Sequence, residues 1–259
     1  MFKRTAAMAA LSLAVLAGCG DVAGGGFSGE QKPGGGETLT VFAAASLSEA
    51  FTALGRTFEG AHPGVKVRFQ FGGSSTLAQQ ITQGAPADVF AAASPATMRT
   101  VTAAGDASGQ PRVFARNRLV IAVPKGDPGK VAKVGDLGRP GLKVVLCAVQ
   151  VPCGAAAKTA LAAARVEVKP VSREQNVKAV VTKVGLGEAD AGLVYRTDVK
   201  AAAGKVTGIE FPEAGKAIND YPIVEVAKAP HGKLAEEFIG LVAGEQGRSA
   251  LSGAGFELP

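Results

Sequence analysis

The sequence has few of the residues that mark nucleic-acid-binding surfaces and metal sites. Its 259 residues include no Trp, two Tyr, two His and three Cys. The net charge is +6, but the basic residues form no run, so clustered cations and stacking aromatics are both missing. His62 and His231 each lie close to a proline in expected surface turns, and too few cysteines remain to complete a zinc site. We therefore expect neither nucleic-acid binding nor a resident metal ion.

Long apolar runs are also missing after the N-terminal leader. No later stretch reaches the roughly 18 apolar residues that a membrane-spanning helix needs. Hydrophobic residues nevertheless make up 47% of the chain and charged residues 19%, which is enough apolar content for a packed core. The 35 glycines lie mainly between apolar segments, as expected for an α/β protein with many turns.

The N-terminus has the layout of an export signal. Lys3 and Arg4 precede an apolar run at 6–16 that is too short to span a membrane as a mature helix. The run ends in Leu-Ala-Gly-Cys at 16–19, which resembles the lipobox of bacterial lipoproteins, in which cleavage precedes a cysteine that carries diacylglycerol. We expect a signal peptide at 1–18 and a lipid on Cys19. The alternative is an ordinary signal peptide with a chance cysteine.

Residues 19–37 are rich in Gly with Ser, Gln, Lys and Pro, a composition that favours a flexible tether. The expected mature protein is thus exported and anchored by lipid to the outer face of the cell membrane. In such a compartment Cys147 and Cys153, six residues apart, are candidates for a disulfide. Two reduced, buried cysteines are the alternative.

The first part of the mature chain alternates strand and helix patterns. Expected strands lie at 41–42, 65–71 and 88–92, and helices begin after each of them, near Leu47, Ser74 and Ser94. Ser46 or Ser48 is placed to cap the first helix. This order predicts an α/β unit with a mainly parallel sheet.

A second α/β unit follows a change of pattern near residue 118. Its expected strands are 119–124, 142–147, 166–168, 189–195 and 206–211, and its expected helices are 154–164 and 174–184. A strand at 223–226 and C-terminal helices resemble a return to the first unit. We predict two α/β lobes, 38–118 plus 222–259 and 119–221, joined by two hinge strands with a ligand cleft between them.

Four strand ends lie directly before expected helix starts, at Ser46, Ser74, Cys153 and the pair Asn176-Val177. Each helix N-terminus presents unpaired N–H donors and a partial positive charge, the serines add hydroxyl donors, and Tyr195 adds a phenol. Taken singly, each serine is more simply a helix cap and Tyr195 a core residue. The set as a whole predicts a site for an oxyanion.

None of these positions carries a charge, which favours an anion without a proton of its own. Hydrogen phosphate carries a proton that needs an acceptor, whereas sulfate and molybdate do not. The acidic residues closest to these turns, Asp88 and Glu174, leave this distinction open.

Five segments resemble successive motifs of the molybdate-binding proteins of bacterial ABC importers, and the likeness extends from about Thr38 to the C-terminus. The segments are VFAAASL at 41–47, SSTLA at 74–78, GAPADVF at 84–90, VPCG at 151–154 and GLVY at 192–195. The resemblance implies a type II periplasmic binding protein that closes on its ligand by a hinge.

The resemblance also implies a ligand set for a tetrahedral oxyanion. It assigns the serine hydroxyls to Ser46 and Ser74, the phenol to Tyr195, and two backbone amides to Cys153 and Val177. Alanine is common in the family where this chain has Cys153, and a backbone donor tolerates that difference. The neighbours of Val177 match the family only loosely.

We therefore predict a monomeric lipoprotein that binds molybdate, and tungstate as well, for a membrane permease of an ABC importer, without enzyme activity or a cofactor. Another tetrahedral oxyanion such as sulfate is the first alternative. A secreted serine hydrolase is a second, but no G-x-S-x-G motif surrounds Ser46 or Ser74. An adhesive or structural lipoprotein without a small ligand is a third.

Overall fold

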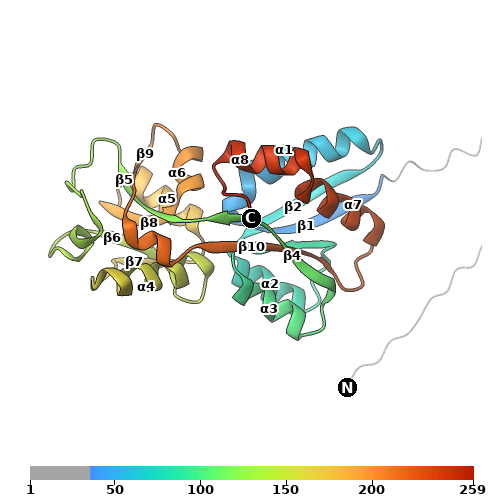
Figure 1. Ribbon diagram of the computed structural model, residues 1–259, viewed down its shortest axis with the longest axis horizontal. Helices are drawn as coiled ribbons and strands as arrows, with labels where there is room; N and C mark the ends of the chain where they lie inside the picture. Colours follow the sequence, from blue (N-terminus) through green and yellow to red (C-terminus); the bar gives the residue numbers. More distant parts are fainter. Residues whose placement is uncertain (1–35) are drawn as a thin grey trace, which may run out of the picture. The chain divides into compact units, whose positions relative to one another are not determined.

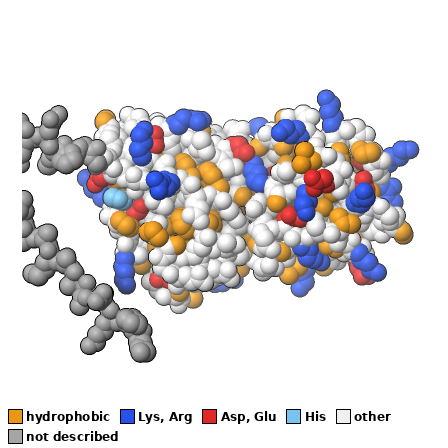
Figure 2. Space-filling model, turned by 180° about the vertical axis from the view of Figure 1, so that it is seen from behind, with side chains coloured by type: hydrophobic (Ala, Val, Ile, Leu, Met, Phe, Trp, Pro, Cys, Tyr) orange, Lys and Arg blue, Asp and Glu red, His pale blue; other side chains and the backbone are white. Residues whose placement is uncertain are grey.

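The computed structural model describes residues 36–259, which contain two five-stranded sheets with helices packed against them (Figure 1). The expected signal peptide, Cys19 and nearly all of the tether lie outside the described residues. Within the described part, no helix is long and apolar enough to cross a membrane. On the face seen in Figure 2, basic side chains are dispersed and acidic side chains lie among them.

The first sheet has five strands in the order β2-β1-β3-β10-β4. Their bounds are β1 Thr38–Ala44, β2 Lys66–Gly72, β3 Val89–Ala91, β4 Ala107–Asn117 and β10 Asn219–Val226. The strands β1, β2 and β3 run parallel to one another, and β10 runs antiparallel to both β3 and β4. The carboxyl ends of β1 and β2 therefore meet at one edge of this sheet.

Helices cover both faces of the first sheet, because β1 has apolar side chains on both of its faces that must be buried. Leu39, Val41 and Ala43 belong to a core with α1 (Ser48–Ala61), α7 (Gly232–Ala243) and α8 (Glu245–Ala254). Phe42 points the other way, into a core with α2 (Ser74–Thr82) and α3 (Pro95–Ala103). Alternation along one strand thus gives the two helical layers seen in Figure 1.

The second sheet also has five strands, in the order β7-β6-β8-β5-β9. Their bounds are β5 Leu119–Pro124, β6 Val144–Cys147, β7 Ser172–Glu174, β8 Ala191–Tyr195 and β9 Val206–Ile209. The strands β6, β7 and β8 are parallel, whereas β5 is antiparallel to β8 and β9. The helices α4 (Pro152–Ala164), α5 (Val177–Gly185) and α6 (Arg196–Ala201) pack against this sheet.

Two stretches of chain join the sheets. The first sheet's edge strand β4 continues through Arg118 into β5, and the chain returns from β9 through the 3-10 turn Pro212–Lys216 into β10 (Figure 1). The predicted pair of crossing segments is therefore present. The lobe boundaries at 118/119 and 221/222 stay a prediction.

One predicted strand is not present. The strand predicted at 166–168 is wrong, because the partner of β6 is Ser172–Glu174, with Val145 opposite Ser172. Val166 and Val168 instead pack as partly buried side chains after Arg165, which ends α4 in a left-handed conformation. Their alternation therefore reflects packing without strand pairing.

The strand β4 and the short helix α6 were not predicted at all. The strand contains Gly109 and Pro111 and exposes several residues, so it lacks the pattern of a core strand. It lies at the edge of the first sheet, which is where a strand tolerates proline.

Candidate anion-binding site

The carboxyl ends of five strands converge on one small cavity. Its volume is about 230 Å³, which is smaller than four hollows elsewhere in the described part, whose volumes are about 920 to 1040 Å³. All five ligand residues predicted from the sequence line it, and each is no more than 4% exposed: Ser46, Ser74, Cys153, Val177 and Tyr195. Residues far apart in the sequence thus meet at one site.

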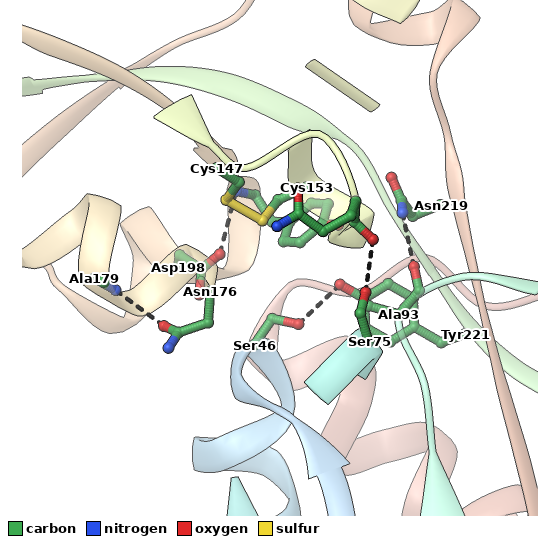
Figure 3. Close-up of a disulfide and its surroundings, with 12 residues drawn as sticks. Ser46, Ser75, Ala93, Cys147, Cys153, Asn176, Ala179, Asp198, Asn219 and Tyr221 are labelled. Atoms are coloured by element: carbon green, nitrogen blue, oxygen red, sulfur yellow. Dashed lines mark hydrogen bonds between the residues drawn. A yellow bond between two sulfur atoms is a disulfide. The ribbon is translucent and has the colours of Figure 1, made fainter. Parts of the chain in front are cut away.

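Ser46 lies in a 3-10 turn, Ala45–Leu47, between β1 and α1. The predicted side-chain cap on α1 is wrong, because the helix is capped by Leu47 and receives no side-chain hydrogen bond. The Ser46 Oγ instead lies 2.9 Å from the Oη of Tyr221, a buried residue of β10 (Figure 3). The 3-10 turn holds this hydroxyl at the cavity rather than over the helix.

Ser74 is the first residue of α2 and follows directly on β2 and Gly73. Its Oγ accepts a hydrogen bond of 3.0 Å from the backbone N–H of Ala93. The carbonyl of Ala93 in turn accepts a 2.7 Å hydrogen bond from the Asn219 side-chain amide (Figure 3). Because the Ser74 oxygen already accepts this N–H, its own proton is available to the cavity.

Cys153 lines the cavity from the first turn of α4. Pro152 is the first residue of the helix and has no N–H, so Cys153 carries the first amide donor. Cys153 is bonded to Cys147 at the end of β6, with a sulfur–sulfur distance of 2.05 Å (Figure 3). The disulfide ties the strand end to the helix start. Gly154 allows the close approach, since a Cβ there would collide with the Ala148 carbonyl.

The helix α5 begins at Val177, another residue of the cavity lining. The Asn176 side chain caps the helix by accepting a 3.0 Å hydrogen bond from the Ala179 N–H (Figure 3). The cap uses an N–H of the first turn that would otherwise lack a partner. The amide of Val177, at the first helical position, has no intrahelical acceptor.

Tyr195 ends β8 and brings a phenol to the cavity. Its hydroxyl is buried and has no hydrogen-bond partner among the described residues. Burial raises the pKa of this phenol well above its usual range, and the neighbouring Tyr221 and Asp198 raise the pKa further. The group therefore stays protonated and remains a donor. A buried hydroxyl without a partner costs about 1–3 kcal/mol, which a ligand oxygen would offset.

Among residues 36–259, no charged side chain lines the cavity. The two acidic residues that left the choice of anion open from the sequence are engaged elsewhere. The Asp88 carboxylate accepts hydrogen bonds from the backbone N–H groups of Thr40 and His231. The Glu174 carboxylate pairs with Lys183 at 2.6 Å, and Lys183 holds the pKa of Glu174 below its usual value. Neither carboxylate faces the cavity.

Charged groups lie beside the cavity on the side of the second sheet. Asp198, in the first turn of α6, is fully buried and accepts a hydrogen bond from the Tyr195 N–H. Burial raises the pKa of Asp198 to about 6, although Lys178, 3.3 Å away, lowers it in part. Lys178 also contacts Glu49 of α1 at 2.8 Å. The pKa of Glu49 would rise through burial, but Lys178 lowers it below the usual value.

Direct contacts join the two sides of the cavity. One is the ion pair between Glu49 of α1 and Lys178 of α5. Another is the Ser75 hydroxyl, which donates a 2.6 Å hydrogen bond to the carbonyl of Gln150 in the loop before α4 (Figure 3). Gly73 packs so closely that a Cβ would collide with the Gln175 carbonyl. The two sides are thus closed on each other.

The chain matches a model of the family described as bacterial extracellular solute-binding proteins, over residues 39–257. The chain belongs to this family. It is 46% identical over 225 residues to the molybdate-binding protein ModA of Mycobacterium tuberculosis, which covers 87% of this chain and 86% of that protein.

Two solved structures share the fold of this solute-binding protein. The periplasmic molybdate-binding protein of Azotobacter vinelandii matches with a TM-score of 0.73 and 24% identity, covering 85% of this chain and 99% of that one. The sulfate-binding protein SubI of Mycobacterium tuberculosis matches with a TM-score of 0.75 and 19% identity, covering 86% and 87%. These likenesses confirm the predicted two-lobed periplasmic binding protein fold.

Several residues around the site of this solute-binding protein were not predicted. Tyr221 and Asn219 contact the serine side of the cavity, and Lys178 and Asp198 lie beside Tyr195. A signal existed for Tyr221, because it is one of only two tyrosines and lies in an apolar strand that must bury its hydroxyl. No sequence signal distinguishes Lys178 from the other lysines on helices.

Proposed function

We propose that this solute-binding protein binds molybdate, and tungstate as well, in the cavity at the strand ends. Ser46, Ser74 and Tyr195 would donate their hydroxyl protons to the oxygens of the anion. The backbone amides of Cys153 and Val177 would complete the set.

The observation that carries the proposal is the buried hydroxyl of Tyr195, which has no partner within the described part of the chain, in a cavity that no charged side chain of that part lines. A tetrahedral dianion would accept this proton and those of the other donors around it. The starts of α2, α4 and α5 at the cavity add partial positive charge, which favours a bound anion without any cation.

The donor set also favours an anion that carries no proton. A hydrogen phosphate would bring an O–H that needs an acceptor, and the nearest candidates, Asp88 and Glu174, are engaged away from the cavity. Burying that O–H without an acceptor would weaken the binding of hydrogen phosphate by roughly 1–3 kcal/mol. Molybdate, tungstate and sulfate avoid this cost. The relative at 46% identity is named a molybdate-binding protein, which favours molybdate over sulfate for this chain.

The proposal extends to the setting of the protein. The bound anion would be delivered to the membrane permease of an ABC importer by a monomer that has no enzyme activity. Cys19 would carry the lipid that holds the protein at the outer face of the membrane. A Cys19→Ala variant should then be released into the medium without an acyl label, and a variant that kept its label would contradict the anchor.

The test of the site is calorimetry on the purified protein with molybdate, tungstate, sulfate and phosphate, together with thermal unfolding. Molybdate and tungstate should bind far more tightly than sulfate and phosphate. A ligand at 1,000 times its dissociation constant should stabilise the protein by about 4 kcal/mol. Equal or tighter binding of sulfate would identify sulfate as the ligand of the site. If none of the four anions stabilised the protein, the proposal that the cavity binds one of them would be wrong.

A further inference from the structure

Tyr221 lies outside the cavity but contacts a residue that lines it. It belongs to β10, its side chain is fully buried, and its Oη lies 2.9 Å from the Ser46 Oγ. Its ring packs edge-on against Phe256, Phe114 and Tyr195. The position of the phenol is thus set by the core of the first sheet and by the site tyrosine.

Distance alone leaves open which of the two hydroxyls donates. Burial decides it. If Ser46 donated to Tyr221, the Tyr221 proton would need another acceptor. Of the polar side chains beside it, Asn117 already accepts the Arg118 N–H through its Oδ1, and the Tyr195 hydroxyl makes no hydrogen bond that meets the geometric requirements within the described residues. If Tyr221 donates to Ser46, the remaining proton belongs to Ser46, which faces the cavity. Only this second arrangement leaves no buried O–H unsatisfied once an anion is bound.

We infer that Tyr221 is a positioning residue of the anion site: its phenol donates to the Ser46 Oγ and thereby turns the Ser46 proton toward the bound anion. The inference rests on the proposed function and adds to it a residue that sets the direction of a proton. Tyr221 itself does not touch the anion.

The same strand supports the other serine in a related way. Asn219 lies two residues before Tyr221, on the same face of β10. Its amide holds the Ala93 carbonyl, and the Ala93 N–H occupies an acceptor position on the Ser74 oxygen. Both serine oxygens therefore accept a hydrogen bond from a neighbouring strand or turn of the protein, so both protons are left for the ligand.

This arrangement has a consequence for selectivity. While Tyr221 donates to the Ser46 oxygen, one of its two acceptor positions is occupied and its own proton points at the anion, so it is badly placed to accept an O–H carried by the anion. Without the phenol proton, Ser46 is free to accept. Loss of the Tyr221 hydroxyl should therefore weaken the binding of unprotonated anions and reduce discrimination against hydrogen phosphate.

The experiment is a double-mutant cycle on molybdate affinity with Tyr221→Phe and Ser46→Ala, measured by calorimetry on the full mature domain. Tyr221→Phe keeps the ring and should lower molybdate affinity roughly tenfold. It should also narrow the ratio of molybdate to phosphate affinity. In the Ser46→Ala background the same replacement should change affinity by less than about twofold, because the residue through which it acts is gone.

Phe256→Leu is the matched control, since it alters the packing around the Tyr221 ring and keeps the hydroxyl. It should leave molybdate affinity within about twofold of wild type. Wild-type affinity in Tyr221→Phe would overturn the inference. So would an undiminished effect in the Ser46→Ala background, or an equal loss in Phe256→Leu, because either would make the role purely structural.

Failure of the proposed function has a different signature, since the wild-type protein would then bind no molybdate at all. If Tyr221→Phe does not fold, neutron diffraction on the wild-type complex locates the deuteron directly. A deuteron bonded to the Tyr221 Oη and directed at Ser46 would support the inference. A deuteron on Ser46 directed at Tyr221 would overturn it.

Discussion

The two sides of the cavity provide donors by different means. The side of the first sheet offers the hydroxyls of Ser46 and Ser74, and neutral groups behind them hold the oxygens in place. The side of the second sheet offers the starts of α4 and α5 together with the Tyr195 phenol. Behind that phenol lies the buried carboxylate of Asp198.

Because one side uses side-chain hydroxyls and the other uses backbone amides, a side-chain replacement can remove a donor from the first side but not an amide from the second. A serine hydroxyl disappears with one substitution, whereas a helix amide survives any substitution except proline. The second side depends instead on the placement of two helix starts, which the disulfide and the Asn176 cap secure. Substitutions on the two sides should therefore separate losses of affinity from losses of stability.

The largest expected effect concerns the charge on the second side. Because burial raises the pKa of Asp198 to about 6, ionising this carboxyl costs more in the folded protein than in the unfolded chain. Its contribution to the free energy of unfolding is therefore most favourable at low pH and falls as the pH rises from about 4 to about 6. A shift of this size corresponds to at most roughly 3 kcal/mol.

Urea unfolding of wild type and Asp198→Asn at several pH values tests this. The free energy of unfolding of wild type, relative to the variant, should decrease between pH 4 and pH 6 and then stay constant. The variant keeps Glu49 and every other carboxyl of the chain, so the difference between the two curves reports on the Asp198 carboxyl. If the free energy of unfolding had the same pH dependence in both proteins, the pKa of Asp198 would not be raised by burial.

The next prediction tests the difference between side-chain donors and backbone donors. Ser74→Ala removes a hydroxyl from the first side and should weaken molybdate binding by about 1–3 kcal/mol, or roughly 5- to 150-fold. Val177→Ala on the second side keeps its amide and should change affinity by less than about threefold, although it lowers stability by roughly 1 kcal/mol or more. Calorimetry and urea unfolding on both variants measure the two quantities. Equal losses of molybdate affinity in Ser74→Ala and Val177→Ala would contradict the distinction between side-chain and backbone donors.

The disulfide should contribute to stability more than to affinity. Replacing both Cys147 and Cys153 by Ala opens a short loop and should lower the free energy of unfolding by about 2 kcal/mol. The amide of residue 153 remains, so molybdate affinity should fall by less than about tenfold. Wild type treated with a reductant should resemble the variant, which itself should not respond to the reductant. A variant that was fully stable but unable to bind would contradict this assignment.

The smallest effect concerns the ion pair between the two sides. Glu49→Gln removes the carboxylate that pairs with Lys178, and exposed pairs of this kind contribute less than about 1 kcal/mol. Molybdate affinity should fall about two- to threefold at low salt and less at high salt, because ions screen the pair. Glu59→Gln is the control, since its partner Lys66 lies on the same side of the cavity. An equal loss in both variants would exclude a role for this ion pair in closure.

Much of the architecture was open to prediction because its residues follow simple periodicities. The helix that begins near Leu47 and the apolar strand 119–124 carry their own patterns, and both are present. The strand β4 escaped prediction because an edge strand can expose polar residues and contain proline. The strand predicted at 166–168 was wrong because an alternating pattern reports which side chains are buried, not which backbone they pair with.

The sequence by itself determined where donors stand along the chain, because a small or polar residue between an apolar strand and a helix marks a helix start whatever surrounds it. Only the tertiary structure decided that Ser46, Ser74, Cys153, Val177 and Tyr195 line one cavity. It also decided which way the serine protons point, because that depends on Tyr221 and Ala93, which approach from strands distant in the sequence. A hydroxyl has no fixed direction of its own, so its role as a donor follows from the partners that packing brings to it.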